Sequence, residues 1–120
     1  MDNKLSSLFW EGYELKDSSL ISDSHILINL RPMAPARCGH CQSMCLLIHD
    51  QTVRQVRDQD ILGYRLTLTL PVRRVRCYAC KTVCREWIEW LPPHSRFTTR
   101  LLIYVEQLAR ILPILHVAQL

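Results

Sequence analysis

The stretch that decides the fold reads RRVRCYACK at residues 73–81, where an alternating apolar segment ends in two closely spaced cysteines. Cys77 and Cys80 form this C-x2-C pair, and Cys38 and Cys41 form a second pair upstream. Two such pairs can supply four thiolates to one tetrahedral zinc ion. The spacing therefore predicts a structural Zn2+ site with these four cysteines as ligands. Each pair reverses the chain, so strands can enter and leave it antiparallel.

Composition limits the class of protein. A chain of 120 residues with 48% hydrophobic residues predicts one domain with a modest core. No apolar run approaches the roughly 20 residues that a membrane span needs, and the N-terminus resembles no signal peptide. We therefore expect a cytoplasmic protein with reduced cysteines, which more often bind metal than form disulfides. A secreted, disulfide-bonded domain is the alternative.

The net charge of +4 is unevenly distributed. Residues 1–36 carry more acidic than basic side chains, and the basic excess lies in residues 37–120, almost entirely as arginine. Arginine binds phosphate in a bidentate manner, so this distribution indicates nucleic acid as a partner. A solvated basic face is the alternative interpretation.

The order of elements predicts an α+β fold with a small antiparallel sheet. Residues 12–21 and 25–30 are expected to form a hairpin, and 45–49 and 81–88 further strands. The clearest strand pattern has apolar residues at alternate positions, namely Tyr64, Leu66, Leu68, Leu70 and Val72. Thr98 or Ser95 can cap a helix that runs to about Leu112, and residues 114–120 are typical of the beginning of a second helix. We divide the chain into an N-terminal hairpin (1–36), a zinc-binding β domain (37–91) and a helical segment (92–120).

Two further cysteines accompany the predicted site. Cys45 follows Cys41 by four residues, and Cys84 follows Cys80 by four. We interpret both as small buried residues on matching strands. A six-thiolate site and an auxiliary redox pair are the alternatives. His40, inside the first pair, is an alternative ligand that four thiolates make unnecessary.

The motifs resemble a known family. Residues 73–82, then Arg85-Glu86 and the segment 92–98, are similar to the N-terminal region of the ISL-three family of bacterial insertion-sequence transposases. That family combines two C-x2-C knuckles with a charged strand of the Arg-x-Val-Arg-Asp type, here residues 54–58. The resemblance implies zinc ligands at Cys38, Cys41, Cys77 and Cys80. It also implies a helix-turn-helix and a catalytic domain with three acidic residues further along.

The chain departs from the family pattern in ways that bear on stability and function. Gly39 stands at a proline-like place, and Gln42 and Lys81 stand where glycine is usual, so the knuckles are expected to be strained. Cys84 occupies a position that is more often aromatic. Residues 114–120 resemble only the beginning of the helix-turn-helix, so we expect this chain to be a fragment or truncated form that does not itself cut or join DNA.

Three functions are compatible with these observations. We favour a zinc-stabilised DNA-binding module that binds the terminal inverted repeats of the element. The second is an interaction or dimerisation module, such as an inhibitor of the full-length transposase, and the third is a redox or metal-storage protein. The predicted DNA contacts are basic residues near the knuckles and the helix. Arg73, Arg74 and Arg76 are expected to fan around the second knuckle. The full set is Arg54, Arg57, Arg73, Arg74, Arg76, Lys81, Arg85, Arg96 and Arg100.

Overall fold

Two long strands form the centre of the protein. The computed structural model describes residues 8–111, in which β5 (Ile48–Ile61) and β6 (Tyr64–Cys77) form an antiparallel pair. Leu62 and Gly63 connect them and have positive φ angles of 52° and 82°. A two-residue turn of this kind matches the right-handed twist of the strands it joins. Pro71 does not interrupt β6, and the pairing of the two strands is irregular at two places on β5, between Ile48 and Asp50 and between Asp58 and Ile61.

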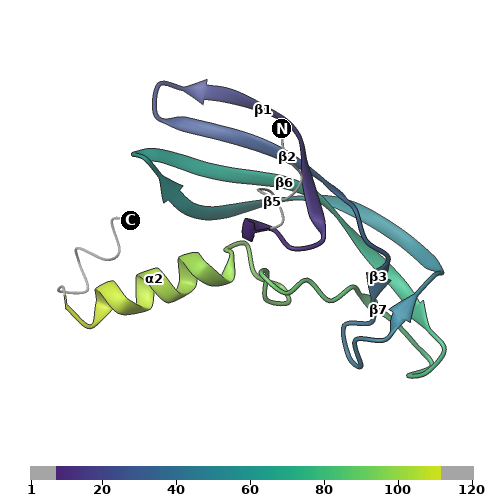
Figure 1. Ribbon diagram of the computed structural model, residues 1–120. Coiled ribbons are helices and arrows are strands. Elements are labelled where there is room, and N and C mark those ends of the chain that lie inside the picture. Colours follow the sequence, from purple (N-terminus) through teal and green to yellow (C-terminus); the bar gives the residue numbers. More distant parts are fainter. Residues whose placement is uncertain (1–7, 112–120) are drawn as a thin grey trace.

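The remaining strands add to β6 on its other side. The predicted hairpin is confirmed as β1 (Tyr13–Ser22) and β2 (His25–Pro32), and β2 pairs with β6. Further along, β7 (Thr82–Arg85) also pairs with β6, which completes a five-stranded sheet (Figure 1). Two short strands, β3 (Ala36–Arg37) and β4 (Met44–Cys45), form a separate two-stranded sheet.

The sheet differs from the prediction in one pairing. We expected antiparallel neighbours throughout, whereas β2 runs parallel to β6 over five paired positions, from His25 opposite Arg65 to Asn29 opposite Thr69. Parallel neighbours need a long crossover connection. Here the crossover contains β3, the first cysteine pair, β4 and β5. The hairpin therefore shares one sheet with the zinc-binding region.

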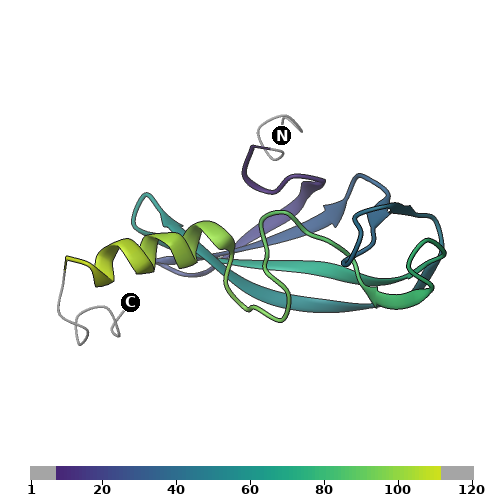
Figure 2. The ribbon, with the colours of Figure 1, turned by 90° about the horizontal axis from the view of Figure 1, so that it is seen from below.

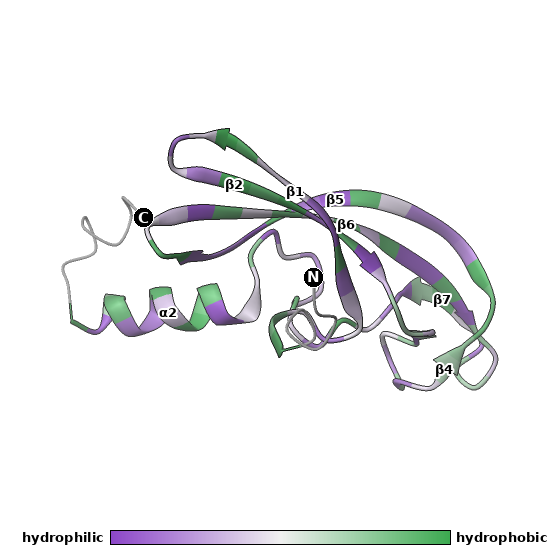
Figure 3. Cartoon of the chain, turned by 45° about the horizontal axis from the view of Figure 1, so that its top comes forward, coloured by the Kyte–Doolittle hydropathy of each residue, from purple (hydrophilic) through white to green (hydrophobic). Residues whose placement is uncertain are grey.

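Buried side chains change position along β6. Even-numbered residues from Leu66 to Val72 are buried, whereas from Arg73 to Cys77 the odd-numbered residues are buried. Because successive side chains point to opposite faces of a strand, the core passes from one face of β6 to the other near Arg73. The hydropathy colours alternate along the strands accordingly (Figure 3).

These buried residues form two clusters. A larger apolar cluster, the leucine cluster, contains Trp10, Tyr13, Ile28, Leu30, Val56, Leu66, Leu68, Leu70, Val72, Ile88 and Leu91. A smaller cluster, the cysteine cluster, contains Ala36, Cys38, Cys45, Val75 and Cys77, with Cys80 and Cys84 packed against it.

The C-terminal part of the described chain is helical, as predicted. Helix α2 (Thr99–Ala109) begins after Thr98, whose side chain accepts a hydrogen bond from the amide of Leu101. The helix lies at one end of the elongated molecule and the cysteine pairs lie at the other (Figure 2).

Two predicted strands are shorter than expected, since residues 46–47 and 86–88 are not in strands. The predicted second helix (114–120) lies outside the described residues.

Candidate metal centre and basic surface

Each cysteine pair lies in a tight reversal between two strands. The first knuckle connects β3 to β4, and the second connects β6 to β7. In the first, the amide of Cys38 donates to the carbonyl of Ser43 at 2.8 Å, and the amide of Gln42 donates to the carbonyl of Cys38 at 2.9 Å. In the second, the amide of Cys80 lies 3.5 Å from Cys77 Sγ. These contacts close each turn around its cysteine pair.

The residue after each pair has a left-handed backbone. Gln42 has a φ of 62° and Lys81 a φ of 58°. This conformation costs residues with a Cβ about 1–2 kcal/mol, whereas glycine adopts it freely. These are the two positions at which the sequence lacks an expected glycine, so the predicted strain is located in the backbone of the two knuckles.

Gly39 allows the first knuckle to approach β7. A Cβ atom at this position would lie 2.3 Å from the carbonyl oxygen of Arg85, which is too close for any side chain. The absence of a side chain therefore lets the first knuckle rest directly on the strand that leaves the second knuckle.

The four predicted ligands converge. The Sγ atoms of Cys38, Cys41, Cys77 and Cys80 all lie within 4.8 Å of one another. Across the two knuckles, Cys38 Sγ lies 3.8 Å from Cys80 Sγ, and Cys41 Sγ lies 3.6 Å from Cys77 Sγ. Four thiolates bound tetrahedrally at about 2.3 Å from zinc would be about 3.8 Å apart. The donor set and its spacing therefore fit a tetrahedral metal ion of this kind.

Local hydrogen bonds prepare these thiols for metal binding. Hydrogen bonds from the side chain and backbone of Ser43 lower the pKa of Cys41 to about 6. At Cys38, burial opposes ionisation, but amide hydrogen bonds from Cys41 and His40 outweigh it and lower the pKa. The hydrogen bond with Cys41, together with burial, raises the pKa of Cys80. Since thiolates are the metal-binding form, the lowered pKa values of Cys38 and Cys41 favour metal binding by the first knuckle.

The two additional cysteines lie beside this centre. Cys84 Sγ is 3.7 Å from Cys38 Sγ but is not one of the four mutually close sulfurs. Burial raises the pKa of Cys45 to about 11, so this thiol remains neutral. Cys45 is buried in the cysteine cluster, in agreement with its interpretation as a small buried residue, whereas Cys84 packs against the cluster and is only partly buried. His40 is exposed and is not one of the four converging residues.

Comparisons with known proteins agree with this geometry. Residues 34–80 match the family model described as the zinc-finger of transposase IS204/IS1001/IS1096/IS1165. The chain is also 35% identical over 106 residues to the "Transposase for insertion sequence element IS1001" of Bordetella parapertussis. Residues 34–80 belong to the N-terminal zinc-binding domain of this transposase family. The alignment covers 84% of this chain and 26% of the relative, so the chain spans about a quarter of that transposase. No solved structure matches the chain significantly.

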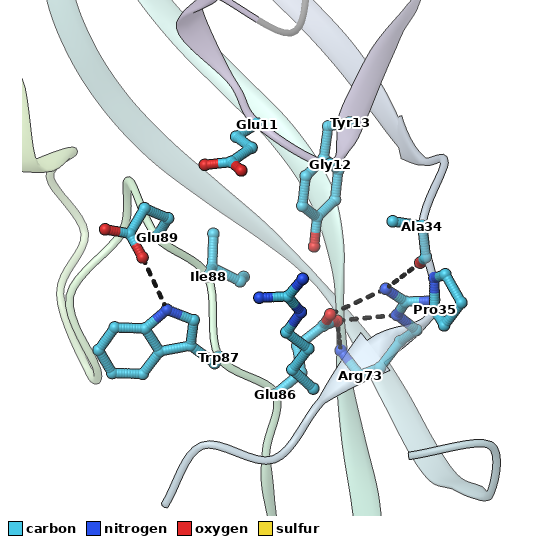
Figure 4. A pocket seen from close by; sticks show the side chains of 11 residues that line it. Glu11, Gly12, Tyr13, Ala34, Pro35, Arg73, Glu86, Trp87, Ile88 and Glu89 are labelled. Carbon is cyan, nitrogen blue, oxygen red and sulfur yellow. Dashed lines mark hydrogen bonds and ion pairs between the residues drawn. The ribbon is translucent and has the colours of Figure 1, made fainter. Parts of the chain in front are cut away.

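Arg73, one of the predicted DNA contacts, is buried. Its guanidinium binds both carboxylate oxygens of Glu86 at 2.9 Å and the carbonyl of Ala34 at 3.1 Å. The two side chains lie at one side of a pocket of about 250 Å³, beneath Tyr13 (Figure 4). The expected fan of three arginines does not form, because Arg73 faces the protein interior while Arg74 and Arg76 are exposed.

Arg100 is also engaged within the protein. It binds both oxygens of Asp58, a fully buried residue that also accepts hydrogen bonds from Trp10 Nε1 at 2.9 Å and Thr98 Oγ1 at 2.6 Å. Asp58 therefore ties the N-terminal segment, β5 and the beginning of α2 together. It is the last residue of the Arg-x-Val-Arg-Asp stretch, which accounts structurally for a carboxylate at that position.

The other predicted DNA contacts remain at the surface or partly buried. Arg74 forms an exposed ion pair with Asp50, and Arg57 lies 3.7 Å from Asp60. Arg54 and Arg85 are half-buried. Besides Arg74, the exposed members are Arg76, Lys81 and Arg96.

Sequence reasoning did not identify the acidic partners Glu86 and Asp58 as buried. Each carboxylate follows or lies within a strand pattern in which a polar residue is ordinarily solvent-facing. Their one sequence signal was the adjacent arginine in the matched motifs, Arg85-Glu86 and Arg57-Asp58.

None of the helices within residues 8–111 is long and apolar enough to cross a membrane.

Proposed function

We propose that this chain is a zinc-stabilised module that binds the DNA ends of an insertion sequence on behalf of a transposase. The observation that carries the proposal is the convergence of four Sγ atoms in a region that matches a transposase zinc-finger family. The arginine-rich surface supports DNA as the partner, since phosphate contacts dominate the affinity of proteins for DNA.

The metal has a structural role in this proposal. Cys38, Cys41, Cys77 and Cys80 would hold Zn2+, which would cross-link the two knuckles without taking part in a chemical step. Binding to a structural site of this type contributes on the order of 10 kcal/mol to folding. The two short strands β3 and β4, with little apolar surface of their own, depend most on that contribution.

We propose a narrower set of DNA contacts than the sequence suggests. Arg73 and Arg100 form buried or partly buried ion pairs with Glu86 and Asp58, so their charge is compensated within the protein. The proposed contacts are the basic residues that face solvent or a groove, namely Arg54, Arg57, Arg74, Arg76, Lys81, Arg85 and Arg96.

The role of this chain within the transposase is likewise a proposal. We assign binding of the terminal inverted repeats to this part of the chain and no step of DNA cleavage. We retain the segments 1–36, 37–91 and 92–120 as functional divisions, with the helical segment leading toward a helix-turn-helix. A cytoplasmic bacterial location follows from that role. The comparisons do not support self-association, and we leave the exposed apolar residues of α2 outside the proposal.

The test is a salt-titrated binding curve of the zinc-loaded protein with the terminal repeat of the element and with a scrambled duplex. Tighter binding to the repeat is expected for a module that recognises element ends. Equal binding with a steep salt dependence would reduce the role to backbone anchoring. Absence of binding at moderate salt would contradict the proposal.

A further inference from the structure

A groove of about 450 Å³ lies between the first knuckle, β7 and the segment after it. Its lining includes His40 from the knuckle, Arg74 from β6, Arg85 from β7 and His94 from the following segment. We call it the Arg85 groove. Trp87, Ile88, Leu91 and Pro93 supply apolar walls. A groove with apolar walls and several basic side chains is suited to an anion that also brings a non-polar surface.

Arg85 is the unusual residue of this groove. Its Nε atom is buried without a hydrogen-bond partner, and within residues 8–111 its side chain donates one long hydrogen bond of 3.4 Å, from Nη2 to the carbonyl of Leu91. Among the described residues, no carboxylate lies within ion-pair distance of it. Burial lowers the pKa of Arg85 and the nearby charge of Arg54 lowers it further, and the opposing influence of Tyr13 and Glu86 is too small to reverse this direction. A partly buried cation beside another cation is unfavourable unless an anion binds there.

The acidic residues near the groove do not supply that anion. Glu86 lines the groove, but both of its oxygens bind Arg73. Asp50 is engaged by Arg74 on the exposed side of the sheet. Arg85 therefore lines the groove as a half-buried cation without a carboxylate partner of its own among the described residues.

We infer that the Arg85 groove binds a backbone phosphate of duplex DNA, with Arg85 donating to the phosphate and His40, Arg74 and His94 lining the groove around it. This inference rests on the proposed function and names where the DNA backbone is held. Arginine provides several donors in a planar group that matches phosphate oxygens. The bound phosphate would supply the hydrogen-bond acceptor and negative charge that Arg85 lacks within the protein.

The groove also connects DNA binding to the metal centre. Its knuckle wall contains Gly39 and His40, and Gly39 rests on the carbonyl of Arg85. Cys38 and Cys41 flank these two residues, so closure of the knuckle forms the wall. We therefore expect removal of the metal to weaken binding at this groove.

The experiment compares Arg85→Met with Arg65→Met in the zinc-loaded protein on a short mixed-sequence duplex. Arg65 is an exposed arginine on β6 outside the groove, and its substitution changes the net charge equally. Arg85→Met is expected to weaken binding about tenfold and to reduce the slope of log affinity against log salt by about 0.9, the value for one phosphate contact. Its melting temperature should equal or exceed that of the parent, because the substitution removes an uncompensated cation.

Arg85→Lys serves as the rescue variant, since it retains the charge and should retain most of the salt slope. If the parent binds DNA but Arg85→Met behaves like Arg65→Met, the inference fails and the proposed function stands. A lowered melting temperature for Arg85→Met would assign Arg85 a structural role and would also overturn it. If the parent itself binds no DNA, the proposed function and the inference fail together.

Discussion

The two ends of β6 are stabilised in different ways. Around Leu66, Leu68 and Leu70 the strand lies in the leucine cluster, where large side chains from β2, β5 and the segment after β7 are removed from water. Around Val75 and Cys77 it lies in the cysteine cluster, whose members are small. Apolar burial contributes about 25 cal/mol per Å², so the second cluster gains much less from the hydrophobic effect.

This difference shows how one continuous strand can serve two kinds of region. The leucine end depends on an alternating pattern that many sequences could satisfy. The cysteine end has four sulfur atoms at spacings that suit a metal ion, which in the proposed function would replace the missing core. The Arg73–Glu86 ion pair lies between the two ends, where the buried positions of β6 change face.

The largest effect is expected from removing one ligand. Cys77→Ser should abolish metal binding and remove a contribution on the order of 10 kcal/mol from the cysteine end. If the two ends differ as described, hydrogen exchange should accelerate most at residues 36–45 and 77–85, and least at residues 66–70. Zinc content and amide exchange of the purified protein measure both effects.

Cys45→Ser is the matched control, because Cys45 is buried in the same cluster but is not one of the four converging sulfurs. It should retain one metal ion. A Cys77→Ser protein that stays metal-loaded would show that the four-thiolate assignment is wrong. Uniform loss of protection along the chain would show that the leucine end has no stability of its own.

A smaller effect is expected at the junction between the two ends of β6, where Arg73 and Glu86 form their buried ion pair. Glu86→Gln keeps the size of the side chain but leaves Arg73 buried without its counter-charge, which typically costs about 3–5 kcal/mol. Urea unfolding measures this loss of free energy. Glu106→Gln, in the exposed pair with Arg110, should cost less than about 1 kcal/mol. Equal costs at the two sites would mean that the junction is not a buried connection between the ends.

Acid should weaken the leucine end through Asp58. Burial alone would raise the pKa of this carboxyl, but hydrogen bonds from Arg100, Thr98 and Trp10 outweigh burial and hold it below its ordinary value. A carboxyl with a lowered pKa in the folded state stabilises the protein above its unfolded pKa of about 3.9, and this stabilisation is lost as the pH falls below that value.

The free energy of unfolding should therefore decline below about pH 4. Asp58→Asn should be less stable at neutral pH and should show a flatter decline in acid. The loss on protonation should be smaller than the loss at Glu86, because a protonated Asp58 can still accept hydrogen bonds from Trp10 and Thr98. An equally steep decline in Asp58→Asn would assign the acid sensitivity to other carboxylates.

The comparison of the two ends also explains what the sequence could predict. Alternation from Leu66 to Val72 and the Thr98 cap are local patterns, and the structure confirms the strand and the helix they predict. The cysteine spacing predicted which sulfurs would converge, because a C-x2-C turn has few possible geometries.

Long-range ion pairs could not be predicted in the same way. Glu86 and Asp58 are single carboxylates among polar neighbours, and their burial depends on partners 13 and 42 residues away in the sequence. The parallel pairing of β2 with β6 was missed for the same reason, since it depends on the path of a crossover and not on any local pattern.

The smallest expected effect tests the strain in the two knuckles. Gln42→Gly and Lys81→Gly each place glycine at a positive φ, and each should stabilise the metal-loaded protein by up to about 1 kcal/mol. Tyr78→Gly is the control, because Tyr78 is an exposed residue of the second knuckle without a positive φ, and this variant is expected to lose stability instead. Because both strained residues belong to the knuckles, the gain should appear in metal affinity and in amide exchange at the cysteine end, with the leucine end unchanged. A gain in stability spread equally over both ends would show that the two regions unfold as one unit. A loss of stability would show that the side chains of Gln42 and Lys81 stabilise the turns more than their backbone strain destabilises them.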